Sequence, residues 1–152
     1  MTYNLGKITE SSRTAFESKV DENKKNKVLK KFSILLQKNQ NKIIQENKKD
    51  IKFANRKKIK ENLIKRLKID TKKIKGIVKS INQIVKIKDP TNKILDKWKR
   101  PNGLIISKVT IPIGVIAVIY ESRPNVTSDV ASLCFKSGNA VVLRGGSEAF
   151  YT

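Results

Sequence analysis

The sequence has 152 residues, of which 34 are Lys or Arg and 13 are Asp or Glu, so the formal net charge at pH 7 is +21. One Cys and no His exclude an intramolecular disulfide and a Cys/His zinc site formed by a single chain, and we expect no metal site. The longest apolar run, Ile111 to Tyr120, is far shorter than the ~20 residues of a membrane helix, and the N-terminus lacks a secretory signal, so we expect a cytoplasmic protein without a membrane segment.

Residues from about Glu10 to Lys88 have the apolar spacing of helices separated by short polar breaks. The clearest helix spans Thr71 to Val85, with one apolar stripe formed by Ile74, Ile77, Val78, Ile81, Ile84 and Val85. Asp70 or Thr71 is expected to cap this helix, and Asp89-Pro90 to end it, because proline disfavours helical geometry in the residue before it. The stripe predicts packing against another protein element, with subunit or membrane-surface contact as weaker alternatives.

The Lys-rich surfaces of these helices admit two interpretations. A dense array of ammonium groups binds nucleic acid at low salt whatever the fold, so a basic binding module is one hypothesis. Specific recognition favours Arg and aromatic side chains, whereas this excess is mostly Lys, mixed with Asn and Ile, and aromatics make up 6% of the chain. We therefore favour a solvated surface and expect no specific nucleic-acid partner.

The residues after about Gly103 have the pattern of an α/β fold. Leu104 to Val109 alternates like a strand, and Gly114 to Tyr120 is a β-branched run typical of strands buried on both faces. A helix follows, with Val126, Val130, Leu133 and Cys134 on one face and a stop at Gly138-Asn139, and Ala140 to Leu143 is expected to be a second strand. Strand, helix and strand over about 30 residues predict a right-handed βαβ unit with parallel strands.

Two polar loops, residues 121–125 and 144–148, follow these strands. Ligands of open parallel sheets bind beyond the carboxyl ends of the strands, and the N-terminus of a helix near Val126 would add N–H donors there. Arg123 and Arg144 add positive charge, so the residues predict an anionic, phosphorylated ligand. In the alternative view Gly145-Gly146 is only a turn, Asn125 only a helix cap, Pro124 only a rigid loop residue, and Glu121 pairs with Arg123.

The runs RPNGL, PIGVIAVIYESRPNVT and KSGNAVVLRGGSEA lie between Trp98 and Phe150. This stretch closely resembles the γ-glutamyl phosphate reductases, or glutamate-5-semialdehyde dehydrogenases, and YESRPNV and LRGGSE distinguish them from other members of the aldehyde dehydrogenase superfamily. Weaker, collinear similarity reaches the N-terminus. The resemblance implies an N-terminal helical region over residues 1–97, and the first βαβ part of a Rossmann-like dinucleotide-binding domain over residues 98–152.

The resemblance also implies a reaction, the NADPH-dependent reduction of L-glutamyl 5-phosphate to L-glutamate 5-semialdehyde and phosphate in proline biosynthesis, by a homo-oligomer. Asn125 looks like the asparagine of the oxyanion hole. Arg144 looks like the residue that meets the adenosine ribose or its 2′-phosphate, and Glu148 like the ribose contact. The implied set is completed by Ser122, Gly145, Gly146 and Ser147 for the cofactor, and by Glu121 for the phosphorylated substrate. We add Arg123 as a contact to the substrate phosphate because of its charge.

The superfamily's nucleophilic cysteine lies far downstream of the GGSE segment, whereas this sequence ends at Thr152. Cys134 falls on the apolar face of the predicted helix, and the sequence has no His to activate it, so we expect an inert, buried thiol. The sequence is thus expected to be an N-terminal portion of the enzyme that is inactive and marginally folded by itself.

Overall fold

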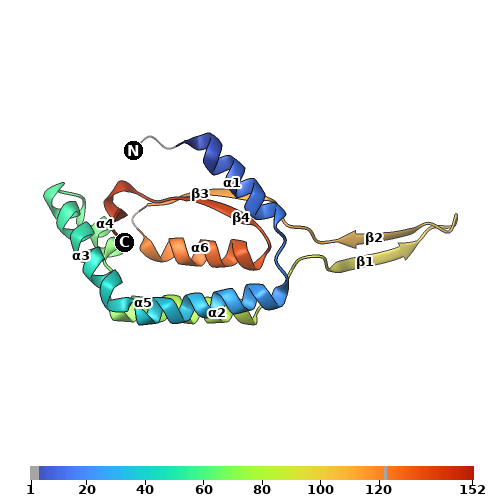
Figure 1. The fold of residues 1–152 in the computed structure, drawn as a ribbon, viewed down its shortest axis with the longest axis horizontal. Coiled ribbons are helices and arrows are strands. Elements are labelled where there is room, and N and C mark those ends of the chain that lie inside the picture. The colour runs from blue at the N-terminus through green and yellow to red at the C-terminus, as the bar shows by residue number, and fades with distance from the viewer. Residues whose placement is uncertain (1–3, 122) are drawn as a thin grey trace.

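The computed structural model describes residues 4–121 and 123–152, in which helices come first and short strands follow (Figure 1). The helices before the first strand are α1 (Leu5–Glu17), α2 (Glu22–Lys38), α3 (Gln40–Arg56), α4 (Glu61–Leu67) and α5 (Thr71–Lys86). The later elements are β1 (Ile94–Lys99), β2 (Ile105–Val109), β3 (Val115–Ile119), α6 (Pro124–Lys136), β4 (Ala140–Arg144) and the 3₁₀ helix η1 (Ser147–Ala149). The predicted α/β class is confirmed. Among the described helices, none has the length and apolarity that crossing a membrane requires.

The core lies where α5 packs against α2 and α6, as the stripe on α5 predicts. Asp70 caps α5, since its carboxylate accepts a hydrogen bond from the N–H of Lys73 at 2.7 Å. Two clusters of buried side chains follow the stripe: Leu29, Ile77, Ile81 and Ile84 in one, and Ile69, Ile74 and Val78 in the other. Full burial of such a side chain stabilises the fold by about 1.5–3 kcal/mol. The apolar stripe of α5 therefore packs against other helices of this chain.

The β3–α6–β4 segment forms the predicted parallel βαβ unit. Val115 pairs with Ala140 and Ile119 with Arg144, so the two strands end together. In Figure 1, α6 lies between this sheet and the pair formed by α2 and α5, while α1 packs against β4. The expectation that β3 is buried on both faces is wrong in this chain: Val115, Ala117 and Ile119 are exposed, because the helices described cover this strand incompletely.

The buried face of α6 also differs from the predicted one. Cys134 is buried, but Leu133 is exposed, and the other buried residues of the helix are polar: Ser128, Ser132 and Lys136. Small Ser side chains suit a helix that packs closely against neighbours on two sides. The helix ends at Lys136, and Gly138 follows its cap residue; a φ of +73° and the small space between Thr91 and Pro112 favour glycine there.

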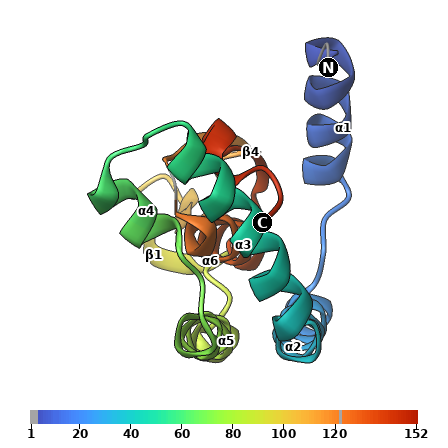
Figure 2. The ribbon, with the colours of Figure 1, turned by 90° about the vertical axis from the view of Figure 1, so that its left-hand side faces the viewer.

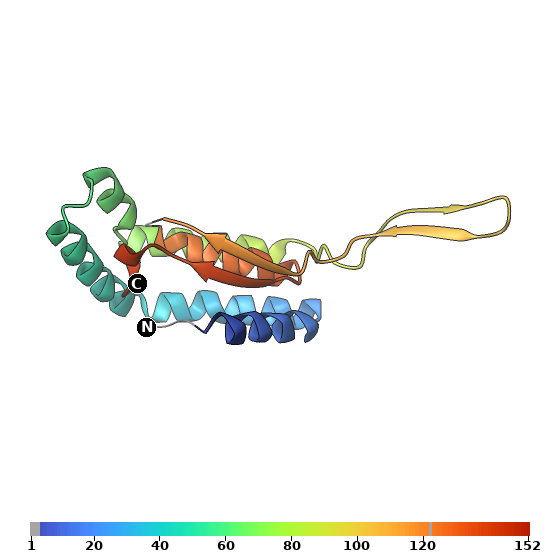
Figure 3. The same ribbon diagram turned by 90° about the horizontal axis from the view of Figure 1, so that it is seen from above.

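An antiparallel hairpin of β1 and β2 extends away from the rest of the fold (Figure 1, Figure 3). The sequence predicts β2 but misses β1, because Asp96, Lys97 and Lys99 interrupt any apolar alternation there. β1 runs across the boundary expected between residues 97 and 98. Each residue of β1 is exposed, and Trp98 is among them.

Candidate functional site

The two polar loops begin side by side at one edge of the β3–β4 sheet. The N–H of Tyr120 donates to the carbonyl oxygen of Arg144 at 3.0 Å, which ties the first residue after β3 to the last residue of β4. The N-terminus of α6 lies at the same edge, because α6 begins at Pro124 immediately after the first loop. The structure therefore brings together the segments in which the predicted site residues lie.

The loop after β3 holds three predicted residues that the structure describes, while Ser122 lies outside the described residues. Arg123 is the N-cap of α6 and supplies no side-chain capping bond, and proline occupies the first turn, where its missing N–H has no cost. Asn125 is inside this first turn, so the alternative that it acts only as the cap is wrong. Its amide donates to Oδ2 of Asp129 at 3.3 Å, and its side chain is half-buried.

Glu121 and Arg123 are both exposed, and the structure gives Glu121 a different ion-pair partner from the one considered above. Oε2 of Glu121 lies 3.9 Å from Nη1 of Arg66 in α4. A surface pair at this distance contributes at most about 1 kcal/mol, so it leaves both groups available to an anionic or cationic ligand. The sequence offered no signal for Arg66, because it is one of many basic residues on a predicted helix.

The loop after β4 contains Arg144, Gly145 and Gly146 and then the turn of η1, which includes Ser147 and Glu148. Gly145 and Gly146 do not have positive φ, so a left-handed turn does not explain glycine there. At Gly145 a Cβ would lie 3.4 Å from the Tyr120 hydroxyl, and at Gly146 a Cβ would collide with the Glu148 carboxylate. A contact of 3.4 Å is ordinary, and the Glu148 carboxylate is the far end of a flexible side chain that can move, so neither φ nor lack of space requires glycine at these two positions.

Tyr120 belongs to the site, although sequence reasoning treated it only as the end of a strand. Its hydroxyl lies 2.5 Å from Oγ1 of Thr127 in α6, and its ring lies 3.5 Å from the point that a Cβ of Gly145 would occupy. The side chain thus links α6 to the loop after β4. A polar aromatic residue at the carboxyl end of a predicted strand, directly before a polar loop, was the signal that could have identified it.

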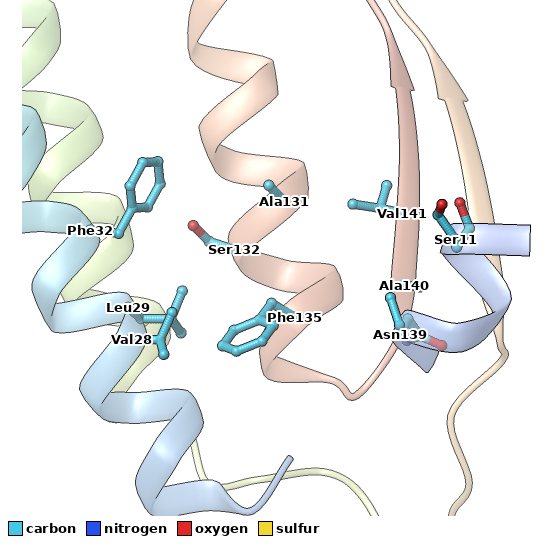
Figure 4. Close-up of a pocket in the computed structure, with 12 residues that line it drawn as sticks. Ser11, Val28, Leu29, Phe32, Ala131, Ser132, Phe135, Asn139, Ala140 and Val141 are labelled. Atoms are coloured by element: carbon cyan, nitrogen blue, oxygen red, sulfur yellow. The ribbon is translucent and has the colours of Figure 1, made fainter. Parts of the chain in front are cut away.

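Glu121, Arg123 and Arg144 are exposed at the sheet edge, and a hollow in the described part of the chain lies elsewhere. That hollow has a volume of about 510 Å³ and lies between α1, α2, α6 and β4. Figure 4 shows its largely apolar lining, which includes Val28, Phe32, Ser132, Phe135 and Val141. None of the predicted site residues lines it. The exposed charged side chains and the N-terminus of α6 meet at the loops and not at this hollow.

Cys134 is a buried thiol in α6, and burial raises its pKa. A thiol acts as a nucleophile in its thiolate form, which a raised pKa disfavours. Within residues 4–121 and 123–152, no group of three or more Cys, Asp or Glu side chains is arranged to hold a metal ion. The described residues at the sheet edge therefore offer positive charge and hydrogen-bond donors, while the thiolate of Cys134 is disfavoured by burial.

Curated proteins that are similar to this chain share one enzyme name, although no model of a known protein family matches it. Over 130 residues it is 52% identical to a γ-glutamyl phosphate reductase of a Thermoanaerobacter species, covering 86% of this chain and 31% of that protein. Over 146 residues it is 48% identical to the γ-glutamyl phosphate reductase of Clostridium tetani, covering 96% of this chain and 34% of that one.

Solved structures agree with the sequence comparison. The crystal structure of γ-glutamyl phosphate reductase from Thermotoga maritima matches with a TM-score of 0.92 and 37% identity, covering 97% of this chain and 36% of that one. The crystal structure of the enzyme from Saccharomyces cerevisiae matches with a TM-score of 0.92 and 29% identity. The match covers 99% of this chain and 39% of that one. By sequence and by fold, this chain is a homologue of the γ-glutamyl phosphate reductases, and it spans about one third of the length of the curated relatives it matches.

Proposed function

We propose that this chain provides the cofactor and oxyanion loops of an NADPH-dependent γ-glutamyl phosphate reductase, which converts L-glutamyl 5-phosphate to L-glutamate 5-semialdehyde and phosphate in proline biosynthesis. The observation that carries the proposal is the β3–α6–β4 unit, which brings residues 121–125, residues 144–148 and the N-terminus of α6 to one sheet edge. The relatives bear the name of this enzyme, and the reaction comes to this chain as our proposal.

The residues at this edge fit a phosphorylated dinucleotide. Arg123 gives α6 no side-chain cap, and although the N–H of Val126 donates to the carbonyl oxygen of Arg123 at 2.9 Å, the positive end of the helix dipole favours a phosphate. Arg144 is exposed at the end of β4, where a guanidinium can pair with the 2′-phosphate. The backbone of Gly145 and Gly146, with Ser147 and Glu148, would hold the ribose side, and Ser122 completes the proposed cofactor set.

Asn125 would stabilise the oxyanion. NADPH supplies the hydride when it is bound. An amide has two N–H donors, and the bond to Asp129 orients the Asn125 side chain through one of them, so the other serves the substrate carbonyl oxygen as negative charge develops there. Arg123 and Glu121 would contact the phosphate and amino-acid parts of the substrate, respectively.

Binding of adenosine 2′,5′-bisphosphate, the phosphorylated half of NADPH, tests the cofactor site. We expect Arg144→Ala to weaken binding about tenfold, because it removes a charge-assisted contact to the 2′-phosphate. Arg100→Ala is the matched control, since Arg100 is an exposed guanidinium beside the hairpin turn and its loss changes the net charge equally. Equal effects of the two substitutions would show that binding reflects net charge alone, and would refute the site.

We further propose that the 152-residue chain does not catalyse the reaction by itself. Its Cys134 is buried with a raised pKa, and the sequence has no His to activate a thiol. Oxidation of NADPH by the purified chain in the presence of glutamyl phosphate would contradict this proposal.

We propose that the intact enzyme is a cytoplasmic homo-oligomer that has no specific nucleic-acid partner. The hairpin supports assembly, because an isolated two-stranded hairpin is marginal in water and this one exposes Ile94, Leu95, Trp98 and Ile105. Exposed Lys residues are spread over α2, α3, α4, α5 and the hairpin, which supports a solvating role for the charge. Sedimentation of the wild-type enzyme and of an Ile105→Lys variant tests the assembly, which the variant should weaken.

A further inference from the structure

Two polar side chains of α3, Asn47 and Asp50, are almost completely buried, each with 1% exposure. They are three residues apart and so share one face of the helix. Burial of a carboxylate or an amide is unfavourable unless hydrogen bonds replace the lost water. The contacts of these two side chains therefore show what the buried face of α3 holds.

The Asp50 carboxylate holds the backbone that follows η1. Oδ1 accepts a hydrogen bond from the N–H of Tyr151, and Oδ2 one from the N–H of Thr152, both at 2.9 Å. The Thr152 hydroxyl donates to Oδ2 at 2.5 Å. Only Ala149 and Phe150 separate Glu148 from Tyr151, so this attachment limits how far the loop after β4 can move.

Asn47 holds the connection between α4 and α5 and the same C-terminal segment. Its Nδ2 donates to the carbonyl oxygen of Leu67 at 3.0 Å and to Oγ1 of Thr152 at 3.1 Å, while its Oδ1 accepts from the N–H of Ile69 at 2.7 Å. Arg66, which pairs with Glu121 in the other loop, directly precedes Leu67. Helix α3 thus packs against both α4 and η1 (Figure 2) and is linked to both loops of the site.

We propose that Asn47 and Asp50 are positioning residues for the sheet-edge site. Asp50 fixes residues 145–148 through Tyr151 and Thr152, and Asn47 fixes the chain that carries Arg66 beside Glu121. Neither side chain touches substrate or cofactor. The inference rests on the proposed function, because it assigns the loop held by Asp50 to the cofactor.

The test measures two quantities on the 152-residue chain: the dissociation constant for adenosine 2′,5′-bisphosphate, and amide hydrogen exchange over residues 145–152. In Asp50→Ala we expect faster exchange in that segment and about tenfold weaker binding. Asp50→Glu restores the carboxylate and should recover part of the affinity. Asp50→Asn keeps the shape of the side chain but places an NH2 group opposite a backbone N–H donor, so one of the two hydrogen bonds is lost. This variant tests the positioning role if Asp50→Ala does not fold.

Asp70→Ala is the matched control, since it removes another structural carboxylate, the cap of α5, without touching the loops. It should speed exchange near residue 73 and leave binding unchanged. If the wild-type chain binds the bisphosphate but Asp50→Asn and Asp50→Ala neither weaken binding nor speed exchange in residues 145–152, the positioning role is refuted and the proposed function stands. Equal weakening by Asp70→Ala would also refute it, as a general effect of stability. If the wild-type chain does not bind the bisphosphate, the proposed cofactor site is refuted, and so is the positioning role that rests on it.

Discussion

A buried ion pair joins the first turn of α2 to the segment that leads into the hairpin. Nζ of Lys25, whose side chain is 3% exposed, lies 2.7 Å from Oδ2 of Asp89. Oδ1 of Asp89 accepts from the backbone N–H of Thr91 at 2.9 Å and from its hydroxyl at 2.7 Å. Replacing Lys25 with Met keeps most of the unbranched apolar stem and leaves the carboxylate without its cation.

The cost of that substitution follows from the geometry. Removal of one partner from a buried pair costs about 3–5 kcal/mol, because the other charge is left uncompensated. Asp89 keeps both bonds from Thr91 and is 12% exposed, so we expect a loss at the lower end, about 3 kcal/mol in the free energy of unfolding. Lys25→Met combined with Asp89→Asn removes the stranded charge and should recover part of the loss.

Urea unfolding, followed by circular dichroism, measures these differences. Lys31→Met, at an exposed position of α2, is the control and should change stability by less than about 0.5 kcal/mol. A Lys25→Met chain as stable as the control would refute the reasoning. So would a double variant that is less stable than Lys25→Met, because the stranded carboxylate would then not be the source of the cost.

The same pair predicts a pH dependence. Burial raises the pKa of Asp89, but the hydrogen bonds from Lys25 and Thr91 lower it by more, so it lies below its ordinary value of 3.8. A depressed folded-state pKa means that the contribution to stability is complete above the unfolded-state pKa and is lost as pH falls through the folded-state pKa. Stability of the wild-type chain should thus fall below about pH 4, and this fall should be smaller in the double variant.

Two further predictions concern α6 and its end. Gly138→Ala should lower the free energy of unfolding by about 1–2 kcal/mol, because φ is +73° and a Cβ would lie 3.1 Å from Thr91 and 3.2 Å from Pro112. Gly76→Ala, in the open middle of α5, should instead be neutral or stabilise by up to about 1 kcal/mol, and urea unfolding that ranks the two alike would contradict this account. The Cys134 thiol should react with an aromatic disulfide reagent only as fast as the chain opens, whereas fast reaction of the folded chain would show that the thiol is accessible.

Features with a local period could be predicted from the sequence. The apolar stripe on α5 repeats at helical spacing, so the core could be predicted. The β-branched run of β3 is followed by a helix and a second strand, so the parallel unit could be predicted as well. Strand β1 was not, because ILDKWK has no alternation and gains its hydrogen bonds from β2 across a turn. The face of α6 was predicted wrongly because Ser132 packs as a small residue, which a hydrophobic pattern does not register.

Contacts between distant polar residues account for the rest. Asn47 and Asp50 look like two more polar positions on a Lys-rich helix, and their partners are residues 67, 69, 151 and 152. Lys25 and Lys136 likewise look like solvated charges, yet both are buried, one against Asp89 and the other against Asn26. A buried charge needs a specific partner, and the identity of that partner depends on the packing of the helices rather than on any pattern along the chain. The interpretation of the Lys-rich helices as solvent-facing therefore fails at Lys25, which links α2 to the base of the hairpin, and Lys136 links α2 to the end of α6 in the same way.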